Sequence, residues 1–198
     1  MTKDLRVNAD RMLASFNQLA LIGATGDGGV NRPTFSEAHL AARKWFREAI
    51  ERSGLEFRTD GAGNHSAVLT CERANVQTLL LGSHLDSVPK GGRFDGALGV
   101  MAALEVLRTV KENGIRLKVN LEAMDFTDEE GTHLSLFGSS AISGHMNPDD
   151  LKKPYSGREN FTAGLARAGS CAARTALQDR RSRPAPSMHE NVAGCWAC

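Results

Sequence analysis

One imidazole and four carboxylates lie close to the ends of two apolar runs and of a glycine-rich loop. They are His84, Asp86, Asp95, Glu129 and Glu130. An imidazole nitrogen, a carboxylate that can bridge through both oxygens and a further carboxylate are ligands suited to divalent zinc, manganese or cobalt. The pattern therefore predicts a site for a pair of divalent metal ions.

Asp86 follows His84 by two positions, so its carboxylate could accept the second ring N–H and fix the imidazole tautomer. The adjacent Glu129 and Glu130 cannot easily both bind metal. One of them could be a ligand while the other acts as general base towards a metal-bound water. The residues alone leave open which glutamate has which role.

Two predicted strands would bring these residues to one edge of a sheet. The apolar run 79–81, bounded by Gly82, predicts a short strand buried on both faces, and 117–126 predicts a second strand. Between them, apolar residues recur at helical spacing from Asp95 to Gly114. A strand, a helix and a strand in this order form a right-handed unit with parallel strands, whose carboxyl ends carry the ligand-binding residues.

Two further helices and a hairpin are expected before this unit. Asn8 should cap a helix that ends at Gly23, and Ser36 should cap one that ends at Gly54. Two strands are expected at 55–59 and 66–71, and 60–64 should form the turn that joins them. The glycine-rich segment 26–33 is a loop by composition.

Three other histidines are expected to have no part in the site. His39 is interpreted as a solvated helix residue, and His65 as a turn residue. His133 lies near Glu130 in the sequence, which invites a role as ligand, but an exposed loop position is the preferred interpretation.

The composition describes an ordinary globular protein with room for one core. The 198 residues carry a net charge of +1, and 41% are hydrophobic while 24% are charged. The chain has no excess of basic residues that would favour nucleic acid as a partner. Since no apolar run could span a membrane and no leader-like segment begins the chain, we expect a cytoplasmic protein without a membrane partner.

Three motifs resemble a known family. They are Gly-Ser-His-Leu-Asp-Ser-Val at 82–88, Gly-Gly-Arg-Phe-Asp-Gly-Ala-Leu-Gly-Val at 91–100 and Phe-Thr-Asp-Glu-Glu-Gly at 126–131. In these stretches the sequence is similar to the N-carbamoyl-L-amino-acid hydrolases, which include allantoate amidohydrolases and β-ureidopropionases and belong to the glutamate-carboxypeptidase-like dimetal peptidases. The resemblance covers about residues 5–165.

The resemblance implies a role for each candidate residue. His84 and Glu130 would hold different metal ions, Asp95 would bridge them, Asp86 would orient His84, and Glu129 would be the general base. It also implies an α/β fold in which helices cover both faces of a sheet in three layers, as an incomplete dimetal-peptidase catalytic domain. The cofactors of the complete enzyme would be two divalent ions, of zinc, manganese or cobalt.

The resembled enzymes are about twice as long as this chain. They take two further metal-binding histidines, a dimerising lid domain and an arginine for the substrate carboxylate from regions that this chain lacks. We expect 1–169 to be the N-terminal part of the catalytic domain, with an incomplete metal site. From about 170 the composition turns to Arg, Pro and Ser, which predicts a disordered and out-of-frame tail at 170–198.

The substrate implied by the resemblance is a small N-carbamoyl or ureido acid, cleaved at its carbamoyl C–N bond. The complete enzyme would be a homodimer, and this truncated form would be inactive. Two alternatives stay open: a dimetal peptidase or aminoacylase with the same fold, and a non-catalytic remnant.

Overall fold

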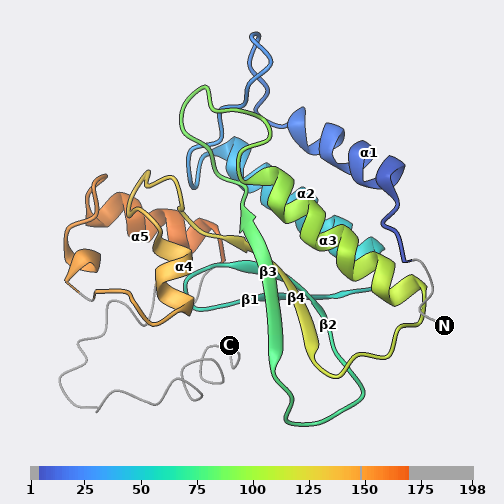
Figure 1. Ribbon diagram of the computed structural model, residues 1–198. Helices are drawn as coiled ribbons and strands as arrows, with labels where there is room; N and C mark the ends of the chain where they lie inside the picture. Colours follow the sequence, from blue (N-terminus) through green and yellow to red (C-terminus); the bar gives the residue numbers. More distant parts are fainter. Residues whose placement is uncertain (1–4, 148, 170–198) are drawn as a thin grey trace.

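The computed structural model describes residues 5–147 and 149–169 (Figure 1). The elements in chain order are α1 (Ala9–Ala20), α2 (Glu37–Arg52), β1 (Glu56–Thr59), β2 (His65–Leu69), β3 (Thr78–His84), α3 (Ala97–Glu112), β4 (Asn120–Phe126), α4 (Phe137–Ile142), the 3₁₀ helix η1 (Asp150–Lys152) and α5 (Arg158–Arg167). The segment 170–198, for which the sequence predicts disorder, lies outside the described residues.

The four strands of the described residues form one mixed sheet in the order β1-β2-β4-β3. The β1–β2 and β2–β4 pairs are antiparallel, whereas β3 and β4 are parallel and are joined through α3. In the parallel ladder Ser83 lies opposite Asp125, and His84 lies opposite Phe126. The predicted strand-helix-strand unit is therefore present, and the α/β fold class is confirmed.

The main core lies between the sheet and the helices α2 and α3. It includes Phe46 and Ile50 of α2, Leu104 and Leu107 of α3, and Ala123 of β4, all of which are buried. The helices α1, α2 and α3 lie together above the sheet, while α4 and α5 lie side by side to its left (Figure 1). The part of the chain that the structure describes has no helix long and apolar enough to cross a membrane.

The local signals for helix starts are largely confirmed. The side chain of Asn8 accepts a hydrogen bond from the backbone N–H of Arg11, and Ser36 accepts one from His39. The third helix starts slightly later than predicted, because Gly96 caps it and Asp95 stays in the preceding loop.

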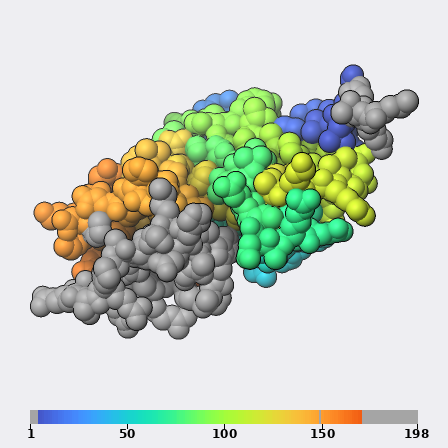
Figure 2. Space-filling view, turned by 60° about the horizontal axis from the view of Figure 1, so that its bottom comes forward, coloured from blue at the N-terminus to red at the C-terminus, as the bar shows by residue number. Residues whose placement is uncertain are grey.

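The strand predicted at 79–81 forms as part of β3, but the prediction that both of its faces are buried is wrong. Within the described sheet β3 is an edge strand, because it pairs with β4 on one side only. Leu79 is 53% exposed, and the green segment that contains β3 reaches the surface in Figure 2. A short apolar run has no feature that separates an edge strand from a central one.

The predicted solvation of His39 and the predicted turn position of His65 are also wrong. His39 is fully buried, and its Nδ1 accepts a hydrogen bond from the backbone N–H of Phe35 at 2.9 Å. His65 belongs to β2 and packs edge-on against Phe57. The His39 contact is local, at the start of α2, whereas that of His65 crosses the β1–β2 hairpin.

His133 is only 7% exposed, in contrast to the predicted loop position. Its ring packs between the rings of Phe35 and Phe161, and its Nδ1 contacts the hydroxyl of Ser156. Both phenylalanines belong to a second core, which joins α4 and α5 to the loop before α2. Aromatic residues distant in the sequence therefore bury this histidine.

Candidate metal centre

His84, Asp95 and Glu130 come together at the carboxyl ends of β3 and β4. His84 is the last residue of β3, Asp95 lies in the loop before α3, and Glu130 lies in the loop after β4. One potential ligand atom from each residue lies within 4.8 Å of the other two. One nitrogen and two carboxylate oxygens at this spacing fit a divalent ion that prefers mixed nitrogen and oxygen ligands.

The orientation of His84 leaves a ring nitrogen free for such an ion. Its Nδ1 lies 3.0 Å from the backbone carbonyl oxygen of Asp86 and 3.6 Å from the Oδ1 atom of the same residue. A carbonyl oxygen can only accept, so Nδ1 carries the proton and the lone pair is on Nε2. The nearer acceptor is thus the main chain of Asp86, and its carboxylate lies just beyond.

The carboxylate of Asp86 also links the loops on either side of the cluster. Its Oδ2 accepts hydrogen bonds from the Thr34 hydroxyl at 3.0 Å and from the backbone N–H of Glu130 at 3.1 Å. Its Oδ1 is buried and has no hydrogen-bond donor among the described residues. Such an unpaired buried oxygen beside the cluster fits a site that binds a cation.

Gly96 allows the loop of Asp95 to approach the imidazole closely. It has φ +63°, and a Cβ atom added there would lie 2.4 Å from the carbonyl oxygen of His84 and 2.5 Å from its ring. No larger residue fits without moving the ring or the loop. The glycine therefore determines how closely Asp95 lies to His84.

Glu129 and Glu130 have different surroundings, although they are neighbours in the chain. The two carboxylate oxygens of Glu129 accept hydrogen bonds from the backbone N–H of Ser139 at 2.9 Å and from its hydroxyl at 2.7 Å. Glu130 instead contributes an oxygen to the three-residue cluster. The backbone turns sharply on both sides of the pair, with φ +60° at Asp128 and +75° at Gly131.

The cluster gathers negative charge. Burial, together with the nearby carboxylates of Asp95 and Asp86, raises the pKa of Glu130. Burial also raises the pKa of Asp125, behind the cluster, to about 6, although Arg43 acts in the opposite direction. A bound cation would stabilise the ionised carboxylates, which is a second way in which these residues fit a metal ion.

Arg43 and Asp125 lie directly behind the cluster, although no motif of the sequence includes them. They form an ion pair of 2.9 Å in which both side chains are almost fully buried. A signal was present, because Asp125 interrupts the apolar run 117–126 and Arg43 lies on the same helix face as Phe46 and Ile50. Charged residues at apolar positions of a pattern indicate buried partners.

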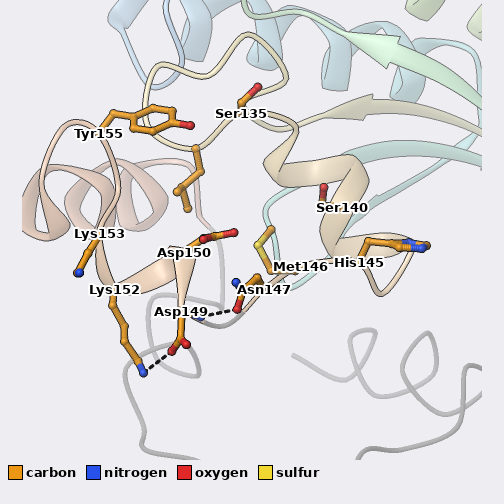
Figure 3. Close-up of a pocket in the computed structure, with 11 residues that line it drawn as sticks. Ser135, Ser140, His145, Met146, Asn147, Asp149, Asp150, Lys152, Lys153 and Tyr155 are labelled. Carbon is orange, nitrogen blue, oxygen red and sulfur yellow. Dashed lines mark hydrogen bonds and ion pairs between the residues drawn. The ribbon is translucent and has the colours of Figure 1, made fainter.

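A pocket of about 540 Å³ lies away from the cluster, between α4 and η1 (Figure 3). Tyr155 and His145 lie at its opposite ends, and Lys152 pairs with Asp149 at its rim. None of the five predicted site residues lines it. The pocket and the candidate metal centre are therefore separate features.

Comparison with known proteins agrees with the fold and with the motifs. Residues 66–156, which contain the whole cluster, match the model of peptidase family M28. An N-carbamoyl-L-amino-acid amidohydrolase from Pseudomonas sp. (strain NS671) is 35% identical over 76% of this chain and 37% of that protein. An allantoate amidohydrolase from Bacillus subtilis (strain 168) is 35% identical over 69% of this chain and 34% of that protein.

The crystal structure of a hydantoinase/carbamoylase family amidase from Burkholderia ambifaria superposes with a TM-score of 0.77 at 34% identity. The aligned part is 84% of this chain and 42% of that chain. Over most of its own length the chain is therefore similar to members of this amidase family. The hydantoinase/carbamoylase resemblance of the motifs is thereby confirmed, and the chain spans about two fifths of the length of these family members.

Proposed function

We propose that this chain is part of a metal-dependent amidohydrolase that cleaves the carbamoyl or ureido C–N bond of a small N-carbamoyl or ureido acid. The convergence of His84, Asp95 and Glu130 carries the proposal. It is supported by relatives whose names are N-carbamoyl-L-amino-acid amidohydrolase and allantoate amidohydrolase.

In this proposal His84 and Glu130 would hold different divalent ions, and Asp95 would be the ligand that they share. Zinc, manganese and cobalt all suit this set of ligands. When bound, the ions supply Lewis acidity towards the substrate carbonyl and lower the pKa of a nearby water. Asp86 keeps the imidazole of His84 in the required tautomer through the contacts at Nδ1.

Glu129 is the proposed general base. It takes a proton from the attacking water as the new C–O bond forms at the carbonyl carbon. It then gives that proton to the nitrogen, which leaves as the C–N bond breaks. Ser139 supports this role because its two hydrogen bonds hold the carboxylate in one orientation, and each oxygen keeps a lone pair for the proton.

The described residues supply three ligands. Two metal ions with at least four ligands each require more than that. We therefore expect the isolated 198-residue chain to bind metal weakly and to be inactive. Residues 1–169 would be the N-terminal part of the catalytic domain of a complete enzyme. That enzyme is expected to be a cytoplasmic homodimer.

The metal site is tested by the metal content of the chain after dialysis against Zn²⁺ or Mn²⁺, measured by plasma emission. The wild-type chain should retain less than one ion per chain, and His84→Ala should retain none. His145→Ala, at an exposed histidine outside the cluster, is the matched control and should behave like the wild type. Retention of metal by His84→Ala would exclude His84 as a ligand, and tight binding of two ions would exclude an incomplete site.

A peptidase or aminoacylase with the same fold is the second candidate, because the matching family model is one of peptidases. A complete enzyme built around this sequence would separate the two. Release of the amino acid from N-carbamoyl amino acids but not from dipeptides or N-acyl amino acids would favour the amidohydrolase, and the reverse preference would favour the second candidate.

A further inference from the structure

We propose that Arg43 and Asp125 are positioning residues that hold the strand ends of β3 and β4 at the spacing that metal binding at His84 and Glu130 requires. The inference rests on the proposed function, because it needs a metal ion at these ligands. It concerns two residues that contact neither the ion nor the substrate.

Asp125 fixes the end of β3. The ladder between β3 and β4 ends at the pair of His84 and Phe126, so Leu85 is the first residue beyond it. The Oδ1 atom of Asp125 accepts a hydrogen bond from the backbone N–H of Leu85 at 2.8 Å. Leu85 lies between His84 and Asp86, and this bond therefore determines where the chain carries the imidazole after the strand ends.

Arg43 fixes the end of β4 at the same time. Its Nε donates to the Oδ2 atom of Asp125 at 2.9 Å, and its Nη2 donates to the hydroxyl of Thr127 at 2.9 Å. Thr127 is the first residue after β4 and precedes Glu129 by two positions. One guanidinium thus contacts the residue that holds the His84 loop and the residue that begins the Glu130 loop.

The third donor of Arg43 reaches the turn between β1 and β2. Its Nη1 donates to the carbonyl oxygen of Gly63 at 2.9 Å. The next residue, Asn64, accepts a hydrogen bond from the backbone N–H of Thr127 at 2.8 Å and donates to the carbonyl oxygen of Gly138 at 3.1 Å. The same turn therefore supports the start of the Glu130 loop from a second direction.

The energetics of buried ion pairs favour a role in positioning over one in stability alone. The side chains of Arg43 and Asp125 are 2% and 0% exposed, so both lose their hydration on folding. The attraction within such a pair often only offsets that loss, and apolar residues of similar volume can serve stability equally well. The specific property of this pair is its set of directed hydrogen bonds to three segments.

Arginine is required for this arrangement because its donors lie in a rigid plane. Three of its nitrogens point to three different acceptors, whereas a lysine has one nitrogen on a flexible stem. Arg43→Lys therefore keeps the positive charge beside Asp125 and removes the simultaneous contacts to Thr127 and Gly63. This variant separates geometry from charge.

The experiment is a Co²⁺ titration of the full 198-residue chain, followed by visible absorption. The matched control is Arg108→Lys, because Arg108 is also a buried arginine that donates to Ser53 and to the carbonyl oxygen of Ala49, but it lies towards the far end of α3. Urea unfolding of each variant gives its folded fraction, and the Co²⁺ affinities are compared for the folded chains.

We expect Arg43→Lys to weaken Co²⁺ binding roughly 10- to 100-fold, the range typical for residues that support metal ligands, and to change the visible bands of the bound ion. Arg108→Lys should lose stability but keep the wild-type affinity and spectrum. Thr127→Val removes only one contact of Arg43 and keeps the shape of the side chain. It should weaken binding in the same direction, and it decides the question if Arg43→Lys does not fold.

Wild-type affinity and spectrum in a folded Arg43→Lys chain would overturn the inference and leave the proposed metal site intact. An equal loss of affinity in Arg108→Lys would overturn it too, since the loss would then follow from stability. If Arg43→Lys does not fold, unchanged binding in Thr127→Val would have the same meaning. No Co²⁺ uptake by the wild-type chain would overturn the proposed metal site itself, and this inference with it.

Discussion

At the scale of single residues, the site depends on two neighbouring glutamates with different partners. Glu130 joins His84 and Asp95, while Glu129 is held by Ser139 at the start of α4. Neighbours on an extended segment point to opposite sides, and the positive φ angles at Asp128 and Gly131 turn the chain around the pair. A ligand and a general base can therefore occupy consecutive positions.

The two glutamates should respond differently to loss of charge. Glu130→Gln should lower metal binding by the isolated chain, because it removes a ligand oxygen with its charge. Glu129→Gln should leave metal content unchanged and, in a complete enzyme, reduce turnover by about 10²- to 10⁴-fold, the usual contribution of a general base. Plasma emission and steady-state kinetics measure the two effects. Loss of metal in Glu129→Gln with retention in Glu130→Gln would reverse the roles.

Residue types explain why part of the site could be predicted and part could not. His84, Asp95 and Glu130 follow predicted strands or a glycine-rich loop, and the rule that carboxyl ends of parallel strands share one edge was enough to expect them together. Arg43 and Asp125 meet only because α2 packs on the sheet. Their places at apolar positions indicate that each is buried, but no local spacing shows that the two residues pair with each other.

At the scale of elements, the loop between β3 and α3 determines the approach of Asp95 to His84. Its last residue, Gly96, combines a positive φ with a backbone position against the imidazole. Gly92, in the same loop, has nothing within 4 Å of an added Cβ atom. The loop therefore contains two glycines that differ in the space around them: a side chain would clash at Gly96 and would be accommodated at Gly92.

Gly96→Ala should weaken both the fold and the metal site. Strain at a positive φ costs about 1–3 kcal/mol, and the new methyl group must displace the ring of His84 or the loop. Urea unfolding and Co²⁺ titration check the two effects. Gly92→Ala is the control and should match the wild type in both, and a Gly96→Ala chain with normal Co²⁺ affinity would contradict the geometry.

Elements were predicted better in type than in surroundings. The strands expected at 55–59 and 79–81 and the helix expected from Asp95 to Gly114 are present, because apolar spacing indicates which local structure can bury one side. Leu79 is nevertheless exposed, and His133 is buried among aromatic rings. The order of the strands determines the exposure of Leu79, and the packing of α5 determines the burial of His133. Neither can be read from the neighbouring residues in the sequence.

At the scale of the whole molecule, buried histidines make stability depend on pH. Burial lowers the pKa of His39 well below its usual value, with the charge of Arg43 adding to the effect, and burial does the same for His65. In the unfolded chain both would titrate near pH 6.5. The unfolded state therefore binds more protons below that pH, and the free energy of unfolding falls as the pH falls.

Removal of one buried histidine should make this dependence less steep. In His39→Asn the amide oxygen can accept the hydrogen bond from Phe35, and the residue does not titrate. Between pH 6.5 and 5.5, the wild type should lose about 1 kcal/mol more of its free energy of unfolding than this variant, and below pH 5.5 the difference in slope should approach about 1.4 kcal/mol per pH unit. Urea unfolding across this range is the measurement.

The exposed His145→Asn should keep the wild-type slope and is the control. An unchanged slope in His39→Asn would show that His39 accepts a proton in the folded chain. The comparison between variants also cancels the opposite contribution of Asp125, whose raised pKa of about 6 is common to all of them.

The strand order has a consequence for synthesis on the ribosome. Among the described strands, β4 is made after the other three and lies between β2 and β3 in the sheet. Until residue 126 has emerged, β3 has no neighbour and the β1–β2 hairpin has an open edge. Pairing must then close contacts such as that of His65 with Asp125 across a long stretch of chain, which is slow compared with local folding. The nascent chain therefore displays the two strand edges with which β4 later pairs, and this is the period in which a chaperone would protect it most effectively from aggregation.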